Sequence, residues 1–101
     1  MQKTVNETFY LAWPRRGGIL KEEVWQTQEG QVVKYSLAYI NPRICRVDNG
    51  RVLGYDNSHD HHHRHFMGEV ASVEFTGYEA LSVRFQKEVQ ELWRQEDEQS
   101  T

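Results

Sequence analysis

Alternating hydrophobic and polar residues characterise most of the chain, and a helical pattern ends it. Strand-like alternation occurs in four stretches, residues 7–13, 19–26, 31–40 and 69–75. The sequence PRRGG at 14–18 breaks any regular element between the first two. The stretch QVVKYSLAYI is the strongest of the four, with one face formed by Val33, Tyr35, Leu37 and Tyr39. Its other face is also apolar in the second half, which is typical of a central strand.

A turn signal lies in the middle of the chain, at Asp48–Gly50. The sequence DNG tolerates the positive φ angles that hairpin turns need. We therefore expect a hairpin whose two arms are RICRV at 43–47 and RVLGYD at 51–56.

One amphipathic helix is predicted near the C-terminus. Thr76 and Glu79 have the spacing of a capping box. Apolar residues then recur at helical spacing, at Tyr78, Leu81, Phe85, Val89 and Leu92. The helix should end at about residues 93–95, and the acidic segment 96–101 should fray into a tail.

These elements predict a single domain covering residues 1–101. The fold class is α+β, an antiparallel β-sheet of about five strands with one C-terminal α-helix packed on a face. Tyr35, Tyr39 and Tyr55 are expected in the core or on a sheet face rather than in a site, and Cys45 is expected to be a buried small residue.

Charge and composition indicate what the protein can bind and in which compartment it resides. The net charge of −3 gives no overall basic field for nucleic acid. The segment 43–65 nevertheless holds four arginines, three acidic residues and all five histidines, so a local positive patch could still bind phosphate. One cysteine permits no internal disulfide, and neither a signal peptide nor a membrane span is apparent, so a cytoplasmic protein without membrane partners is expected.

The stretch GYDNSHDHHHRHFMG, residues 54–68, contains every histidine of the chain. If it is extended, alternation places His59, His61, His63 and His65 on one side, with His62 and Arg64 on the other. If it is helical, His59, His62 and His63 share a face. Both conformations gather imidazoles.

A metal site is one interpretation of this cluster. Zinc takes three or four nitrogen, oxygen or sulfur ligands. His59, His61, His63 and His65 could supply them, with Asp56 or Asp60 completing the set. Every candidate histidine is local, so no second ligand set supports the site from elsewhere.

General acid–base catalysis is the other interpretation, and it needs no cofactor. RNA cleavage through its own 2′-hydroxyl requires a base for that proton, an acid for the 5′-oxygen and a cation on the phosphate. Histidine can fill the first two roles and arginine the third. Asp56 or a tyrosine could orient an imidazole.

The motif also resembles a known family. The chain from Val33 to Phe85, and the sequence DNGRVLGYDN.H...HRH..G within it, resembles the TumE-type toxins of toxin–antitoxin modules. The matching positions are Tyr55, Asp56, Asn57, His59, His63, Arg64, His65 and Gly68. His62 falls where relatives often carry histidine, whereas Asp60 and His61 depart from the family pattern.

The resemblance implies a toxin paired with a helix-turn-helix antitoxin, and an RNA-cleaving activity. On this hypothesis His59, His63 and His65 supply acid and base, and Arg64 holds the phosphate. Asp56 and Asn57 orient a histidine or the loop. Further candidates for phosphate contact are Arg51 and His62.

Two alternatives remain open from the sequence. The first is a non-enzymatic metal-binding or protein-interaction module that uses the same histidines. The second is a nucleotidyl or phosphoryl transferase toxin, although no glycine-rich phosphate loop is present. An exposed sheet edge could pair with the antitoxin or with a second copy, which keeps a homodimer open.

Overall fold

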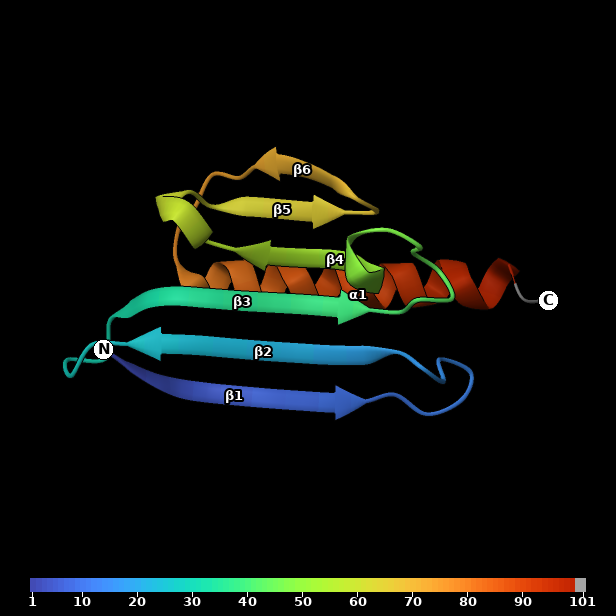
Figure 1. Cartoon of the computed structure of the whole chain (residues 1–101), viewed down its shortest axis with the longest axis horizontal. Helices are drawn as coiled ribbons and strands as arrows, with labels where there is room; N and C mark the ends of the chain where they lie inside the picture. The colour runs from blue at the N-terminus through green and yellow to red at the C-terminus, as the bar shows by residue number, and fades with distance from the viewer. Residues whose placement is uncertain (100–101) are drawn as a thin grey trace.

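A twisted antiparallel sheet with one long helix behind it forms the structure (Figure 1), a computed structural model that describes residues 1–99. The strands are β1 Gln2–Tyr10, β2 Ile19–Gln26, β3 Val32–Ile40, β4 Arg51–Asp56, β5 His63–Phe66 and β6 Glu69–Ser72. The helix is α1 Tyr78–Gln99. The strands lie in the sheet in chain order, each antiparallel to the next. The predicted α+β class is confirmed, with six strands within residues 1–99 where about five were expected.

The middle of the sheet differs most from the sequence prediction. Residues 43–47 were predicted as a strand, but they form an irregular connection, and β4 pairs with β3 instead. The cause is local, because the Asn41 carbonyl accepts the amides of both Ile44 and Cys45 and curls the chain. The DNG segment does form a turn, labelled η1, in which Asp48 and Asn49 have φ angles of 50° and 54°.

The sixth strand is β5, which lies inside the histidine stretch. It is held between β4 and β6, and a two-residue turn joins it to β6, with Met67 and Gly68 at φ angles of 50° and 88°. Edge strands differ in length from their predictions. The predicted strand at 7–13 is displaced to Gln2–Tyr10, and that at 69–75 is shortened to Glu69–Ser72.

The helix extends further than predicted, through Gln99 rather than to residues 93–95. Glu96 explains the extension, because its carboxylate accepts a 2.9 Å hydrogen bond from the buried Tyr39 hydroxyl. Arg15, from the β1–β2 connection, donates to the Trp93 carbonyl and to Asp97. The predicted frayed tail is therefore wrong for residues 96–99, and its last two residues lie outside the described part of the chain.

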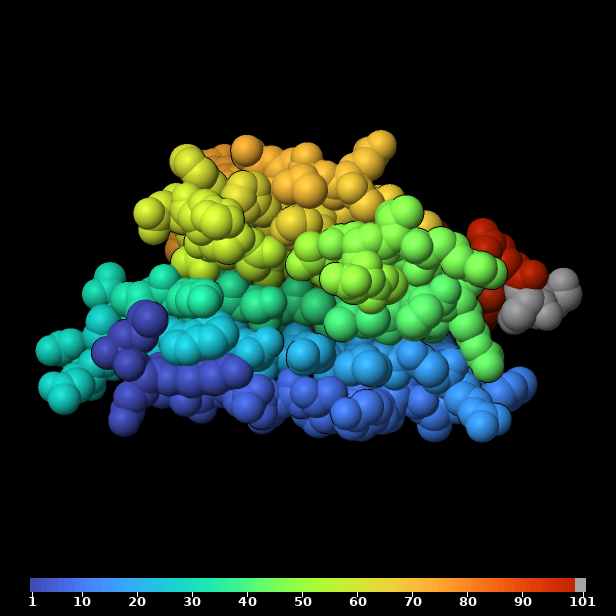
Figure 2. Space-filling view, in the orientation of Figure 1, coloured from blue at the N-terminus to red at the C-terminus, as the bar shows by residue number. Residues whose placement is uncertain are grey.

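The core lies between α1 and the centre of the sheet. Its buried members are Tyr35, Leu37, Tyr39, Cys45, Val52, Leu53, Tyr55, Leu81, Phe85 and Val89. This confirms the predicted core positions of the three tyrosines and of Cys45. No helix of residues 1–99 covers the opposite face of the sheet, and Figure 2 views the molecule from that side. We call it the open face.

Candidate active site

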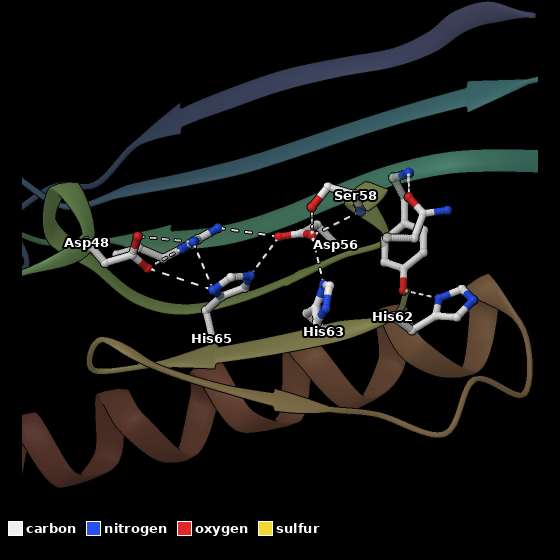
Figure 3. A network of polar contacts seen from close by, with 9 residues as sticks. Asp48, Asp56, Ser58, His62, His63 and His65 are labelled. Atoms are coloured by element: carbon white, nitrogen blue, oxygen red, sulfur yellow. Dashed lines mark hydrogen bonds and ion pairs between the residues drawn. The ribbon is translucent and has the colours of Figure 1, made fainter. Parts of the chain in front are cut away.

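Strand β5 divides the histidine motif between the two faces of the sheet. Successive side chains of a strand point to opposite faces. His63 pairs with Asp56 across β4, and His65 pairs with Gly54. Both histidines lie on the open face (Figure 3), whereas Arg64 points toward the helix, as the extended alternative predicted.

Asp56 is the centre of the polar contacts on the open face. Its Oδ1 accepts hydrogen bonds from the Ser58 amide at 3.1 Å and from the Ser58 hydroxyl at 2.8 Å. Its Oδ2 lies 2.8 Å from His65 Nε2 and 3.6 Å from Arg51 Nη1. Burial alone would raise the pKa of Asp56, but the Ser58 hydrogen bonds and His65 outweigh it and lower that pKa. Asp56 is therefore a carboxylate at neutral pH.

Arg51 connects this carboxylate to a second one. Its guanidinium donates to Asp48 through Nε at 2.8 Å and Nη2 at 3.1 Å, and Nη2 also donates to His65 Nδ1 at 3.0 Å. Gly54 makes room for this arrangement. A Cβ at position 54 would lie 2.6 Å from Arg51 Cδ, so the arginine side chain occupies the space of the missing side chain.

The two partners of His65 fix its tautomer. Arginine has donors only, so His65 Nδ1 must accept and its proton must be on Nε2. That proton faces the Asp56 carboxylate. The Nε2–Oδ2 contact has the distance of an ion pair but not the alignment of a hydrogen bond, and Nε2 is buried without any other partner among the described residues. Unsatisfied buried groups of this kind call for an explanation, and a catalytic role is one.

His63 is held less tightly than His65. Its Nδ1 lies 3.8 Å from Asp56 Oδ1, and its side chain is 24% exposed against 15% for His65. Its ring centre is 6.2 Å from that of His65 and 6.1 Å from that of His61. The exposed His61 thus approaches the cluster. We call Asp48, Arg51, Asp56, His63 and His65 the histidine–aspartate cluster.

Arg64 lies on the other side of the sheet, apart from this cluster. It donates to Glu88 of α1 at 2.5 Å and to the Tyr55 hydroxyl at 3.2 Å. Tyr55 in turn donates to Glu88. Burial would lower the pKa of Arg64, but Glu88 raises it above its usual value. The predicted phosphate contact by Arg64 is thus not placed beside His63 and His65.

His62 and Asn57 also have partners on the helix side. The His62 ring stacks on Phe75 with centres 4.0 Å apart, and its Nδ1 lies 2.7 Å from the Tyr35 hydroxyl. Asn57 accepts the Tyr35 amide and donates to the Val33 carbonyl, both at 3.0 Å, so it holds the end of β4 against β3. His59 is exposed on the turn η2, Ser58–Asp60, and takes no part in the cluster's contacts.

Comparison with protein-family models decides which family the chain belongs to. The model described as Toxin TumE matches residues 16–93, from the β1–β2 connection to the last part of α1. The chain belongs to the TumE toxin family. A search of curated proteins and a search of solved structures each returned no match.

Membership of the TumE family gives the chain a biological role and a partner. It is the toxin component of a toxin–antitoxin system, and an antitoxin is its partner. The matched region contains the whole histidine–aspartate cluster, whereas β1 precedes it. Within the described residues, α1 is too polar to cross a membrane.

The histidine–aspartate cluster of this TumE-family chain contains a cation of its own, the Arg51 guanidinium. Among residues 1–99, no group of three or more His, Cys, Asp and Glu side chains is arranged to hold a metal ion. The donor set explains this in part, because Arg51 places a cation between the two aspartates and beside His65. A divalent cation would have to displace that guanidinium.

Three members of the site were not found from the sequence. Asp48 was interpreted only as a turn residue, yet it is the main partner of Arg51. Ser58 was not singled out, although a serine two residues after an aspartate is a known signal for this local hydrogen bond. Gly54 carried no signal at all, because its importance depends on where the Arg51 side chain lies.

Proposed function

We propose that this toxin is a metal-independent endoribonuclease whose catalytic groups are His63, His65, Asp56 and Arg51. One observation carries the proposal. Two imidazoles lie side by side on an open sheet face, both near one carboxylate, and an arginine contacts that carboxylate and one of the imidazoles. This set contains the acid, the base and the phosphate-binding cation that cleavage through a 2′-hydroxyl requires.

Asp56 and His65 form the basic half of this mechanism. The carboxylate faces the Nε2 proton and leaves the lone pair on Nδ1, which is the relationship of a carboxylate-oriented catalytic histidine. In the free protein Arg51 occupies that lone pair. A phosphate that draws the guanidinium toward itself would free Nδ1 to take the proton of the 2′-hydroxyl.

His63 supplies the general acid of this mechanism. The 2′-oxygen attacks phosphorus, the bond to the 5′-oxygen breaks, and protonated His63 donates a proton to that leaving oxygen. The products are a 2′,3′-cyclic phosphate and a 5′-hydroxyl end. Arg51 replaces Arg64 in the phosphate role, since Arg64 pairs with Glu88 on the far side of the sheet.

The partner is proposed to be a helix-turn-helix antitoxin. Both edges of the sheet support pairing with another chain, since β1 and β6 each have one neighbour within the described residues. The longer edge is β1, with Phe9 and Tyr10 54% and 80% exposed. A homodimer through the same edge is the competing occupant, and the mass of the purified toxin with and without antitoxin would separate the two.

The test uses two active-site variants and one matched control. His63→Ala and His65→Ala should each lower the RNA cleavage rate by about 10²-fold or more in the presence of EDTA. His59→Ala should retain activity, because His59 is exposed and outside the cluster. The same two variants should no longer arrest growth when expressed without antitoxin.

Growth arrest by both variants at unchanged expression would refute the catalytic assignment. Loss of wild-type cleavage on EDTA treatment would instead favour a metal-dependent enzyme. Product ends other than a 2′,3′-cyclic phosphate and a 5′-hydroxyl would contradict the role of the 2′-hydroxyl.

A further inference from the structure

The open face continues past the catalytic cluster onto β1, β2 and β3, where it is basic. Strand register aligns Glu23, Ser36, Asp56 and His63 in one row across the sheet, and Lys21, Ala38, Gly54 and His65 in the next. Lys21 of this face therefore shares a cross-strand row with His65. The function proposed above makes no use of them.

Three lysines gather around one carboxylate on this part of the face. Lys3 forms a 2.5 Å ion pair with Glu23, while Lys21 and Lys34 act on the same group electrostatically. The hydrogen bond from Lys3, followed by the other lysine charges, lowers the pKa of Glu23 despite its partial burial. One carboxylate against three ammonium groups leaves a positive surface on a chain whose net charge is −3.

An aromatic ring lies among these lysines. The Lys3 and Lys34 ammonium groups lie 5.0 Å and 4.6 Å from the centre of the Trp25 ring. Lys3, Trp25 and Lys34 are cross-strand neighbours on β1, β2 and β3. Cations flanking an aromatic ring on an open sheet are the elements with which proteins bind single-stranded nucleic acid, through phosphate contact and base stacking.

A groove joins this basic surface to the catalytic cluster. Its volume is about 250 Å³, and it is lined by Lys21, Glu23, Ser36, Ala38, Ile40, Asp48, Asn49 and Arg51. Lys21 stands on one side, while Asp48 and Arg51 of the cluster stand on the other. The small side chains of Ser36 and Ala38 lie between them on β3. Neighbouring strands are about 4.8 Å apart, so β2 lies about 14 Å from β5, with β3 and β4 between them.

We propose that the open face of β1–β3, with Lys3, Lys21, Lys34 and Trp25, binds the single-stranded RNA that flanks the phosphate to be cut. This inference rests on the proposed ribonuclease function, to which it adds a substrate class and a binding site. Lys21 contacts the backbone next to Arg51 in the groove. The strand then continues toward Lys34 and Trp25, on which a base stacks. Duplex RNA cannot offer an unstacked base to Trp25 and is bound less well.

Binding is measured on the wild-type chain with a 2′-O-methylated oligoribonucleotide, which lacks the attacking hydroxyl and stays intact. Lys21→Gln and Lys34→Gln should each weaken binding about three- to tenfold. Each should also reduce the slope of log K against log salt by about 0.7, the value for one lost phosphate contact on a single strand. Trp25→Leu should weaken binding without changing that slope.

Lys87→Gln is the matched control, because Lys87 is an exposed lysine on α1, away from the open face. It should bind like the wild type. Equal effects of the Lys21, Lys34 and Lys87 substitutions, or no effect of any, would overturn the inference. A duplex that competes as well as the single strand would overturn its single-stranded part.

Cleavage of a dinucleotide separates this inference from the function on which it rests. A dinucleotide spans the catalytic cluster alone, so Lys21→Gln and Lys34→Gln should cleave it at the wild-type rate while losing activity on longer RNA. If the wild type cleaves neither substrate but the lysine variants still lose binding, the ribonuclease proposal fails and the binding site stands. If both substrates are cleaved and the lysine variants match the wild type on each, the binding site is refuted.

Discussion

Gly54 determines where the Arg51 guanidinium can lie. Arg51 is the first residue of β4. Its side chain runs along the strand, so that its Cδ occupies the space next to the Gly54 Cα. From there it reaches Asp48, Asp56 and His65. A residue without chemistry of its own thus fixes the contacts of the group proposed to bind phosphate.

Gly54→Ala is expected to damage activity more than stability. The new methyl group would meet a flexible side chain at 2.6 Å, which can move, and the Leu37 carbonyl oxygen at 3.2 Å. Displacing the guanidinium should lower the cleavage rate about ten- to a hundredfold, since small misplacements of a catalytic group have effects of this size. Cleavage rates and thermal unfolding midpoints would be measured on the same preparations.

A double-mutant cycle tests the cause of that loss. In the Arg51→Ala background the obstructing Cδ is gone, so Gly54→Ala should have little further effect on the rate. An additive loss in the double variant would show that Gly54 acts through something other than Arg51.

At the level of secondary-structure elements, the contact between β5 and α1 explains why the sequence HRH contains an arginine between two histidines. Because β5 alternates, the same three residues present two imidazoles to the open face and a cation to the helix. There Arg64 pairs with Glu88, and Tyr55 donates to the same carboxylate. Burial, followed by the hydrogen bond to Glu88, raises the pKa of Tyr55 to about 12, so its hydroxyl stays a donor.

Arg64→Ala should therefore act on stability. It removes a charged partner of Glu88 and the donor to the Tyr55 hydroxyl from a partly buried network. We expect a loss of about 1 to 2 kcal/mol in unfolding free energy, measured by urea denaturation. The folded fraction should keep its cleavage rate. Arg84→Ala is the control, because Arg84 contacts the same Glu88 from a half-exposed position, and it should cost about 0.5 kcal/mol or less. A stable but inactive Arg64→Ala chain would restore Arg64 to the phosphate role.

The strands and the helix also show how much of the fold can be predicted from the sequence. Strand β2 was predicted with the right bounds, and the apolar faces of β3 and the stripe of α1 located the core. Strand β5 was left open between an extended and a helical conformation, because three of its four residues, two histidines and an arginine, give no strand signal and its pairing with β4 and β6 determines its conformation. The helix end was misplaced because its cause, the contact between Tyr39 and Glu96, joins positions far apart in the chain.

The site was predicted as far as local spacing allows. Alternation correctly separated His63 and His65 from Arg64 for an extended chain, and Asp56 was one of two candidates, with a tyrosine, to orient an imidazole. Which arginine joins them depends on the register of β3 and β4 and on the turn that returns Asp48 to Arg51. No short-range pattern contains that information.

At the scale of the whole molecule, the two faces of the sheet carry different groups. One face carries the core, α1 and the Arg64–Glu88 pair. The other carries the histidine–aspartate cluster, the groove and the basic surface, and no helix of residues 1–99 covers it (Figure 2). Substitutions on the open face should therefore alter the proposed cleavage or RNA binding rather than stability. One residue of this face is expected to affect stability as well, through the pH dependence of folding.

That residue is Asp56, whose pKa is lowered in the folded chain. A carboxyl group with a folded pKa below its unfolded value, about 3.9, stabilises the fold at all higher pH values. The contribution is lost as pH falls through the folded pKa. Asp56→Asn removes this contribution, and the amide oxygen can still accept from Ser58, so the variant should fold.

Urea denaturation from pH 3 to pH 7 would compare the wild type with this variant. Wild type should be the more stable above about pH 5, and the difference should shrink below about pH 4. A difference that is constant across the range, or that grows toward low pH, would mean that Asp56 is not held as a carboxylate by Ser58 and His65.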